Sequence, residues 1–142
     1  MNHRNGRPNG ATFDVYMIKR DALMVMRPGG TLGARTSEKI IDLVEIKEDQ
    51  VETGFNRFCD LTHLDGIRLS SIEIYKLAER RRAYNPNDIH VKSAFLATDP
   101  LAFGIARMYE QLLRSPRIEV RVWTDMQSAA DWLDVDIEKL RL

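Results

Sequence analysis

The chain has 142 residues, of which 44% are hydrophobic, and this is enough to bury the core of one compact domain. Its 21 basic residues balance 21 acidic ones, so no net field attracts nucleic acid or an anionic membrane surface. A single cysteine excludes an internal disulfide, and neither a signal-peptide pattern nor an apolar run of membrane-spanning length occurs. We therefore expect a soluble cytoplasmic protein with no nucleic acid partner and no membrane span.

The first ten residues, MNHRNGRPNG, contain three Asn, two Gly and one Pro and offer nothing to bury. This composition predicts a flexible tail over residues 1–10. We assign residues 11–142 to a single α/β domain, because the length leaves no room for a second one and no internal repeat occurs.

Two short β-rich runs, residues 13–18 and 23–27, predict an antiparallel hairpin whose turn contains Arg20 and Asp21. The Pro-Gly-Gly stretch at 28–30 predicts the end of its second strand. We expect this hairpin to form the edge of a sheet.

A helix is expected next, because Thr36 or Ser37 can cap its start and apolar residues then recur at helical spacing until Gly54. Residues 55–61 predict the third strand. The stretch THLDGIR, residues 62–68, predicts a loop after it.

The following helix begins with the signature of a capping box, because Ser70 and Glu73 are three residues apart. It is expected to run to about Tyr84, where Asn-Pro-Asn-Asp at 85–88 breaks it. An N-cap hydroxyl contributes about 1 kcal/mol by satisfying a free backbone N–H, so we interpret Ser70 as a structural cap.

Residues 91–113 carry most of the information on fold class. Residues 91–97 form a short apolar run with little alternation, which is typical of a parallel strand covered on both faces. Asp99 can cap the helix that follows, and Pro100 suits its first turn. Apolar residues recur along this helix every three or four positions, which predicts that one face packs on the core. These residues are Leu101, Ile105, Met108 and Leu112.

Residues 118–123 alternate apolar and charged side chains and predict a fifth strand, after which Thr124 or Asp125 can cap a last helix. The order β, β, α, β, α, β, α, β, α predicts the α/β class. We expect a single open mixed sheet of about five strands, with an N-terminal antiparallel hairpin and about four helices on its faces.

The stretch FCDLTHLDGIRLSSIEI resembles the STAS-type domain of anti-sigma-factor antagonists, in which a strand ends in Asp and a serine caps the next helix. By its order of elements over residues 13–134, the chain also resembles uncharacterised bacterial proteins of the SpoIIAA-like superfamily, described as STAS or Sec14-like. The resemblance implies a SpoIIAA-like fold. The best local matches are CDLTHL, AFLATDPLAFGIARMYEQL and VRVWTDMQSAADWL.

In the antagonists, a kinase that also acts as an anti-sigma factor phosphorylates the serine at the helix start. Ser70 and Ser71 match that position, although Arg68 and Leu69 stand where an acidic residue normally precedes the serine. A phosphate there would gain from the helix dipole and from Arg68. The resemblance thus implies a phosphoswitch, while the capping box by itself explains Ser70.

Polar residues gather at the carboxyl ends of two predicted strands, where ligands of α/β sheets usually bind. Cys59 and His63 are four residues apart, but a buried free Cys mostly behaves as a small apolar residue, so we assign no catalytic residue. The three histidines lack metal-ligand spacing, so we predict neither a metal site nor a cofactor. The candidate residues of a ligand or phosphorylation loop are Asp60, Thr62, His63, Asp65, Ser70, Ser71, Thr98 and Asp99.

The leading hypothesis is a non-enzymatic STAS-like domain that acts by contact with a protein partner, in a regulatory role, or by binding an apolar small ligand. The alternative is a small enzyme or phosphoswitch that uses the loop over residues 60–71. An acidic block at 38–52 and a basic block at 68–82 complement each other if their helices are neighbours in one protomer, and orient a dimer if they face different subunits. With the balanced net charge, we expect a homodimer. The methionines that can line an apolar cavity are Met17, Met24, Met26, Met108 and Met126.

Overall fold

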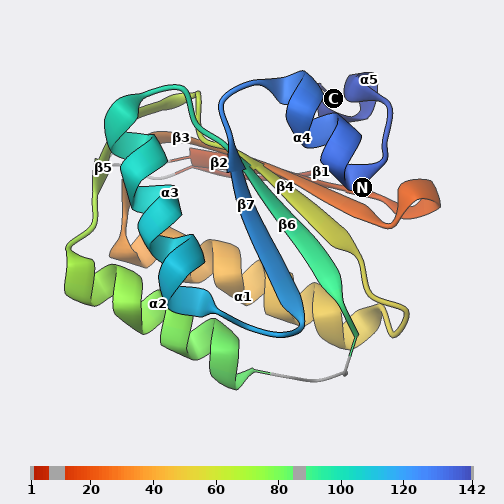
Figure 1. The fold of residues 1–142 in the computed structure, drawn as a ribbon, viewed down its shortest axis with the longest axis horizontal. Helices are drawn as coiled ribbons and strands as arrows, with labels where there is room; N and C mark the ends of the chain where they lie inside the picture. The colour runs from red at the N-terminus through yellow and green to blue at the C-terminus, as the bar shows by residue number, and fades with distance from the viewer. Residues whose placement is uncertain (1, 7–11, 85–88, 142) are drawn as a thin grey trace.

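A central sheet with helices on both faces forms the fold in the computed structural model (Figure 1), which describes residues 2–6, 12–84 and 89–141. The strands are β1 (Asn2–Gly6), β2 (Thr12–Ile18), β3 (Leu23–Gly33), β4 (Asn56–Asp60), β5 (Leu64–Arg68), β6 (Val91–Leu96) and β7 (Ile118–Trp123). The helices are α1 (Ala34–Gln50), α2 (Ser71–Ala83), α3 (Pro100–Leu113), α4 (Met126–Leu133) and α5 (Ile137–Leu140), and a short 3-10 turn covers Lys19–Asp21.

Six strands lie in the order β1-β2-β3-β4-β6-β7, and β5 pairs with β3 off this path. The pairs β1–β2 and β2–β3 are antiparallel, whereas β3–β4, β3–β5, β4–β6 and β6–β7 are parallel. The α/β class and the open mixed sheet with an antiparallel hairpin are confirmed. The hairpin of β2 and β3 is not itself the edge, because β1 lies outside it.

β3 is longer than predicted because it changes its parallel partner halfway. Its residues 23–26 pair with β4 and its residues 30–33 pair with β5. Pro28 lies between these two pairings, where no parallel partner requires the N–H that proline lacks. The Pro-Gly-Gly stretch that we expected to end the strand therefore lies inside it.

The two faces of the sheet carry separate groups of helices. In Figure 1, α1, α2 and α3 lie below the sheet and α4 and α5 lie above it. Alternate side chains of β3 enter the two cores: Met24 and Met26 pack on the side of α1 and α3, and Leu23 and Val25 on the side of α4 and α5. None of the helices within residues 2–6, 12–84 and 89–141 has the length and apolarity needed to cross a lipid bilayer.

β6 occupies the central position that the apolar run at 91–97 predicts. It lies between β4 and β7 and is parallel to both. Ala94 and Leu96 are buried in the core under α4, and Phe95 on the opposite face meets the Tyr109 ring edge to face. The prediction of a buried parallel strand is confirmed.

Two segments differ from the sequence-based expectation. Residues 2–6 form β1, although composition predicts a tail over residues 1–10; backbone pairing with β2 requires no apolar side chains. The stretch THLDGIR contains β5 rather than only a loop, because this strand pairs with β3 alone and tolerates Asp65 and Gly66. The rest of the predicted tail and the helix breaker at 85–88 lie outside the described residues.

Candidate functional site

The carboxylate of Asp60 closes the turn that follows β4. Asp60 is only 2% exposed, and one of its oxygens, Oδ1, accepts hydrogen bonds from the backbone N–H of Thr62 at 2.9 Å and from the Thr62 hydroxyl at 2.6 Å. Its other oxygen lies 3.4 Å from Nε2 of His63, whose imidazole is exposed. The structure therefore brings together three of the predicted loop residues, and Asp60 already has partners within its own turn.

The other candidate residues of the loop region have local structural positions. Ser70 caps α2: its hydroxyl accepts from the N–H of Glu73 at 3.1 Å, and the Glu73 carboxylate accepts from the N–H of Ser70 at 2.9 Å. The predicted capping box is confirmed. Asp65 is exposed on β5, and Ser71 is the first residue of α2.

The residues after β6 also serve a helix start. Asp99 caps α3 by accepting hydrogen bonds from the backbone N–H groups of Leu101 and Ala102, both at 3.1 Å. Thr98 is exposed beside it. The structure does not gather all eight candidates into one pocket, because several of them point their polar groups into the backbone of their own turn or helix.

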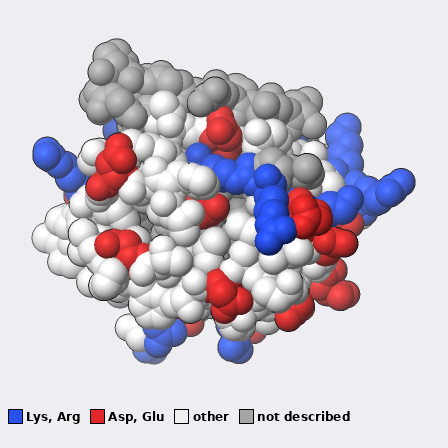
Figure 2. All heavy atoms as spheres, turned by 90° about the horizontal axis from the view of Figure 1, so that it is seen from above, with Lys and Arg blue, Asp and Glu red and all other residues white. Residues whose placement is uncertain are grey.

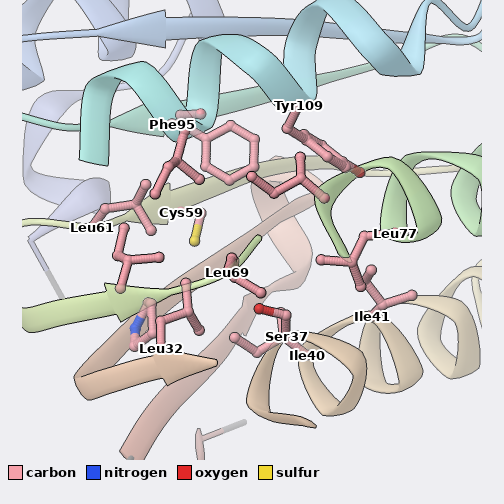
Figure 3. Close-up of a pocket in the computed structure, with 15 residues that line it drawn as sticks. Leu32, Ser37, Ile40, Ile41, Cys59, Leu61, Leu69, Leu77, Phe95 and Tyr109 are labelled. Carbon is pink, nitrogen blue, oxygen red and sulfur yellow. The ribbon is translucent and has the colours of Figure 1, made fainter. Parts of the chain in front are cut away.

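An apolar cavity of about 120 Å³ lies between the sheet and α1, α2 and α3. Side chains from all three helices and from β3, β4, β5 and β6 converge on it, as Figure 3 shows. None of the eight candidate polar residues lines it, and neither does any of the five methionines proposed above. The residues that line the apolar cavity are Pro28, Leu32, Ser37, Ile40, Ile41, Cys59, Leu61, Ile67, Leu69, Ile74, Leu77, Phe95, Ile105, Ala106 and Tyr109.

The apolar cavity offers few groups for chemistry. Burial raises the pKa of the Cys59 thiol, and the nearby Asp60 charge raises it further, so this cysteine stays protonated and unreactive. Burial likewise raises the pKa of the Tyr109 phenol despite the opposing charges of Arg81 and Arg57. The lining is therefore uncharged at neutral pH. Ser37 adds a buried hydroxyl from α1.

A buried ion cluster joins α1, α2 and β4. The Glu48 carboxylate accepts a hydrogen bond from Arg57 at 2.8 Å and two from Arg81, at 2.7 and 3.0 Å. Burial alone would raise the pKa of Glu48, but the hydrogen bond from Arg81 and the charges of both arginines outweigh it, so the pKa is lowered. The three side chains are buried, which makes this cluster part of the frame that holds α1 and α2 on the sheet.

The acidic and basic helical blocks meet within one protomer. Arg80 of α2 pairs with Asp42 at 2.6 Å and with Glu45 at 2.8 Å on α1. These blocks therefore complement each other inside the molecule. On the opposite side of the molecule, seen in Figure 2, acidic and basic side chains are interspersed rather than gathered in a patch of one sign.

Two of the four apolar residues that we expected α3 to pack on the core are exposed. Of the predicted core residues, Ile105 lines the apolar cavity and Leu112 packs against buried residues. Leu101 and Met108 are instead 58% and 36% exposed. The helix instead buries Ala102, Ala106 and Leu113 against the protein, because small side chains let it lie close to the sheet. Ile72 and Tyr75 of the neighbouring α2 are also exposed.

Comparisons with known proteins identify the fold. No protein family model matches the chain, and no curated protein is similar to it. A similar solved structure is that of an uncharacterized protein from the DUF3478 family with a SpoIIAA-like fold, from Shewanella loihica PV-4. The two structures agree with a TM-score of 0.56 and 18% sequence identity over 94% of this chain and 95% of that chain. The protein has a SpoIIAA-like fold, as its resemblance implied.

Proposed function

We propose that this domain binds a small apolar ligand in the apolar cavity between the sheet and α1, α2 and α3. The observation that supports this function is the lining itself, in which aliphatic and aromatic side chains from seven elements line a space of about 120 Å³. Core side chains normally leave few voids larger than a water molecule. A space of this size and composition favours an apolar guest over water, because water needs polar partners.

The volume limits the class of ligand. A dry cavity of about 150 Å³ lined by Leu, Ile and Phe can hold benzene or xenon. The apolar cavity of this protein, at about 120 Å³, therefore suits a single six-membered ring or a short branched alkyl group. The Ser37 hydroxyl can pair with one polar substituent, so a phenol or a cyclic alcohol is a suitable probe.

Phenol and cyclohexanol titrations followed by thermal unfolding test this function. A ligand that binds only the folded state raises the melting temperature as its concentration exceeds Kd. Ile105→Trp places a large ring in the apolar cavity and should abolish this rise, whereas Leu101→Trp adds the same ring on the exposed side of the same helix and should preserve it. Ala106→Leu is a second cavity-filling variant in case Ile105→Trp does not fold.

The titrations contradict the proposal if neither probe binds the wild-type protein at millimolar concentration. They also contradict it if the folded filling variants bind as tightly as the Leu101→Trp control.

The two other functions raised by the sequence have less support in the geometry. An enzyme or phosphoswitch over residues 60–71 would use groups that already hold a turn or cap a helix, as Asp60 and Ser70 do. The exposed apolar side chains of α2 and α3 support contact with a protein partner. This contact stays a prediction. The exposed apolar residues are Ile72, Tyr75, Leu101 and Met108.

A further inference from the structure

β7 forms one edge of the sheet. It pairs with β6 on one side, and within the described part of the chain no strand pairs with its other side. An edge strand presents a row of backbone N–H and C=O groups that can pair with a further strand. We call the side of β7 that faces away from β6 its free edge.

The hydrogen bonds to β6 show which residues of β7 face the free edge. The carbonyl of Arg117 accepts from the N–H of Val91 at 2.8 Å, and the carbonyl of Trp123 accepts from the N–H of Ala97 at 2.9 Å. Backbone groups of consecutive strand residues point to opposite sides, so the odd-numbered residues from 117 to 123 face β6. The backbone groups of the even-numbered residues at 118, 120 and 122 therefore face the free edge.

The side chains of β7 are divided in the same way between the two faces of the sheet. Ile118 and Val120 are buried in the core next to α3. Glu119 and Arg121 lie on the opposite face, and each side chain is 55% exposed. The free edge thus has an apolar side and a side with one negative and one positive charge.

We propose that two copies of this chain associate through their β7 strands, in an antiparallel pair centred on Val120. In this register Val120 lies opposite Val120 of the second copy, and Ile118 lies opposite Val122. Every residue that faces the free edge then forms a hydrogen-bonded pair, and Glu119 lies opposite Arg121 of the second copy. The same patch serves both copies, as a twofold dimer requires.

The charges select this register over its neighbours. Centring the pair on residue 119 places Glu119 opposite Glu119, and centring it on residue 121 places Arg121 opposite Arg121. Like charges directly opposite each other destabilise a strand pair, whereas opposite charges stabilise it. A shift by one residue places charged side chains opposite apolar ones and brings the wrong backbone groups to the edge.

The charges on β7 also differ from those that usually keep an edge strand from pairing with another chain. Such edges commonly carry charges of one sign, often Lys, which repel a second copy. Glu119 and Arg121 instead make the edge complementary to itself. This contact uses neither the charged blocks of α1 and α2, which pair inside the protomer, nor the apolar cavity.

Charge reversal tests the proposal in sedimentation velocity runs from micromolar to near-millimolar protein. The wild-type chain should form dimers, and Glu119→Arg and Arg121→Glu should each weaken dimerisation at least tenfold because they place like charges opposite each other. The double variant Glu119→Arg/Arg121→Glu reverses both signs and should restore the dimer. All three variants change exposed side chains, so melting temperatures should confirm that they fold.

Cysteine crosslinking tests the register. Val120→Cys should form an intermolecular disulfide on oxidation, because hydrogen-bonded antiparallel partners have Cα atoms about 5.5 Å apart, within disulfide range. Ile118→Cys is the matched control and should not crosslink, since the two cysteines would be about 13 Å apart along the strands.

A strictly monomeric wild-type chain overturns the proposal. A dimer that keeps its affinity in both single charge variants also overturns it. Loss of that dimer in Leu101→Ser would assign the contact to the exposed side of α3 instead.

Discussion

Glu48 of α1 links this helix to α2 and to β4 through buried ion pairs. Its carboxylate is buried between Arg57 and Arg81, and both guanidinium groups are buried with it. A buried charge pair adds little over apolar packing, but removal of one partner leaves the other charge uncompensated. The stability of the domain therefore depends on keeping the cluster complete.

Glu48→Gln should lower the free energy of unfolding by about 3 kcal/mol, because two buried arginines lose their shared carboxylate. Urea unfolding measures this change. Glu38→Gln on the same helix is the control, since Glu38 is exposed, and it should change the stability by less than about 0.5 kcal/mol. Equal stabilities of the two variants would contradict the role of the cluster.

The same carboxylate should make stability depend on pH. The pKa of Glu48 is lower in the folded state than its ordinary value of 4.5, so its contribution is present above that pH and is lost as the pH falls through the folded pKa. Below about pH 4.5, the wild-type protein should lose stability more steeply than Glu48→Gln does. Parallel pH profiles of the two proteins would show that Glu48 is not the titrating group.

Ser70→Ala should lower stability by about 1 kcal/mol because the hydroxyl satisfies a backbone N–H at the start of α2, and Ser70→Asp, itself a good cap, should lose little. Ser71→Ala is the control, because Ser71 lies inside the helix. Chemical unfolding measures all three. Recovery of a stoichiometric phosphopeptide containing Ser70 from the native host, or a partner that binds the Ala form and rejects the Asp form, would support the phosphoswitch instead.

β6 is a central strand of the parallel part of the sheet. It pairs on both sides, and Phe95 packs against Tyr109 and lines the apolar cavity. Phe95→Asp should prevent folding, because it places a charge among apolar side chains without a partner. Phe95→Leu, the control, should fold with a lower melting temperature. Circular dichroism during heating measures both, and an unchanged melting temperature of Phe95→Asp would contradict this position of the strand.

The elements that the sequence predicts well are those marked by residues close together in the chain, such as helix caps. The capping box at Ser70 and the Asp99 cap with Pro100 each lie within four residues, and both helix starts are confirmed. β5 was missed because its stability comes from pairing with β3, more than thirty residues away in the chain, rather than from its own composition. Leu101 and Met108 of α3 were wrongly assigned to the core, because apolar spacing does not show that the small Ala102 and Ala106 pack closer to the sheet.

The candidate site was less predictable than the fold. Local polar residues such as Asp60 and His63 were found, and they do contact each other. The apolar cavity was not located, because its lining comes from seven elements and each lining residue is an ordinary core residue in its own segment. Only the tertiary structure shows that these side chains leave a space between them.

At the scale of the whole molecule, the SpoIIAA-like fold separates two surfaces. The apolar cavity lies between the sheet and α1, α2 and α3, while no strand within the described residues pairs with the outer side of β7. The ligand binding and the self-association that we propose thus involve different parts of the sheet. Filling variants of the apolar cavity should leave the dimer intact, and charge variants of β7 should leave probe binding intact.

A crystal structure under xenon pressure tests ligand binding in the apolar cavity most directly, because xenon is apolar and fits a space of about 120 Å³. We expect strong xenon density between Cys59, Phe95 and Ile105 in the wild-type protein and none there in Ile105→Trp. A wild-type cavity that is collapsed, filled with ordered water or empty of xenon would contradict it.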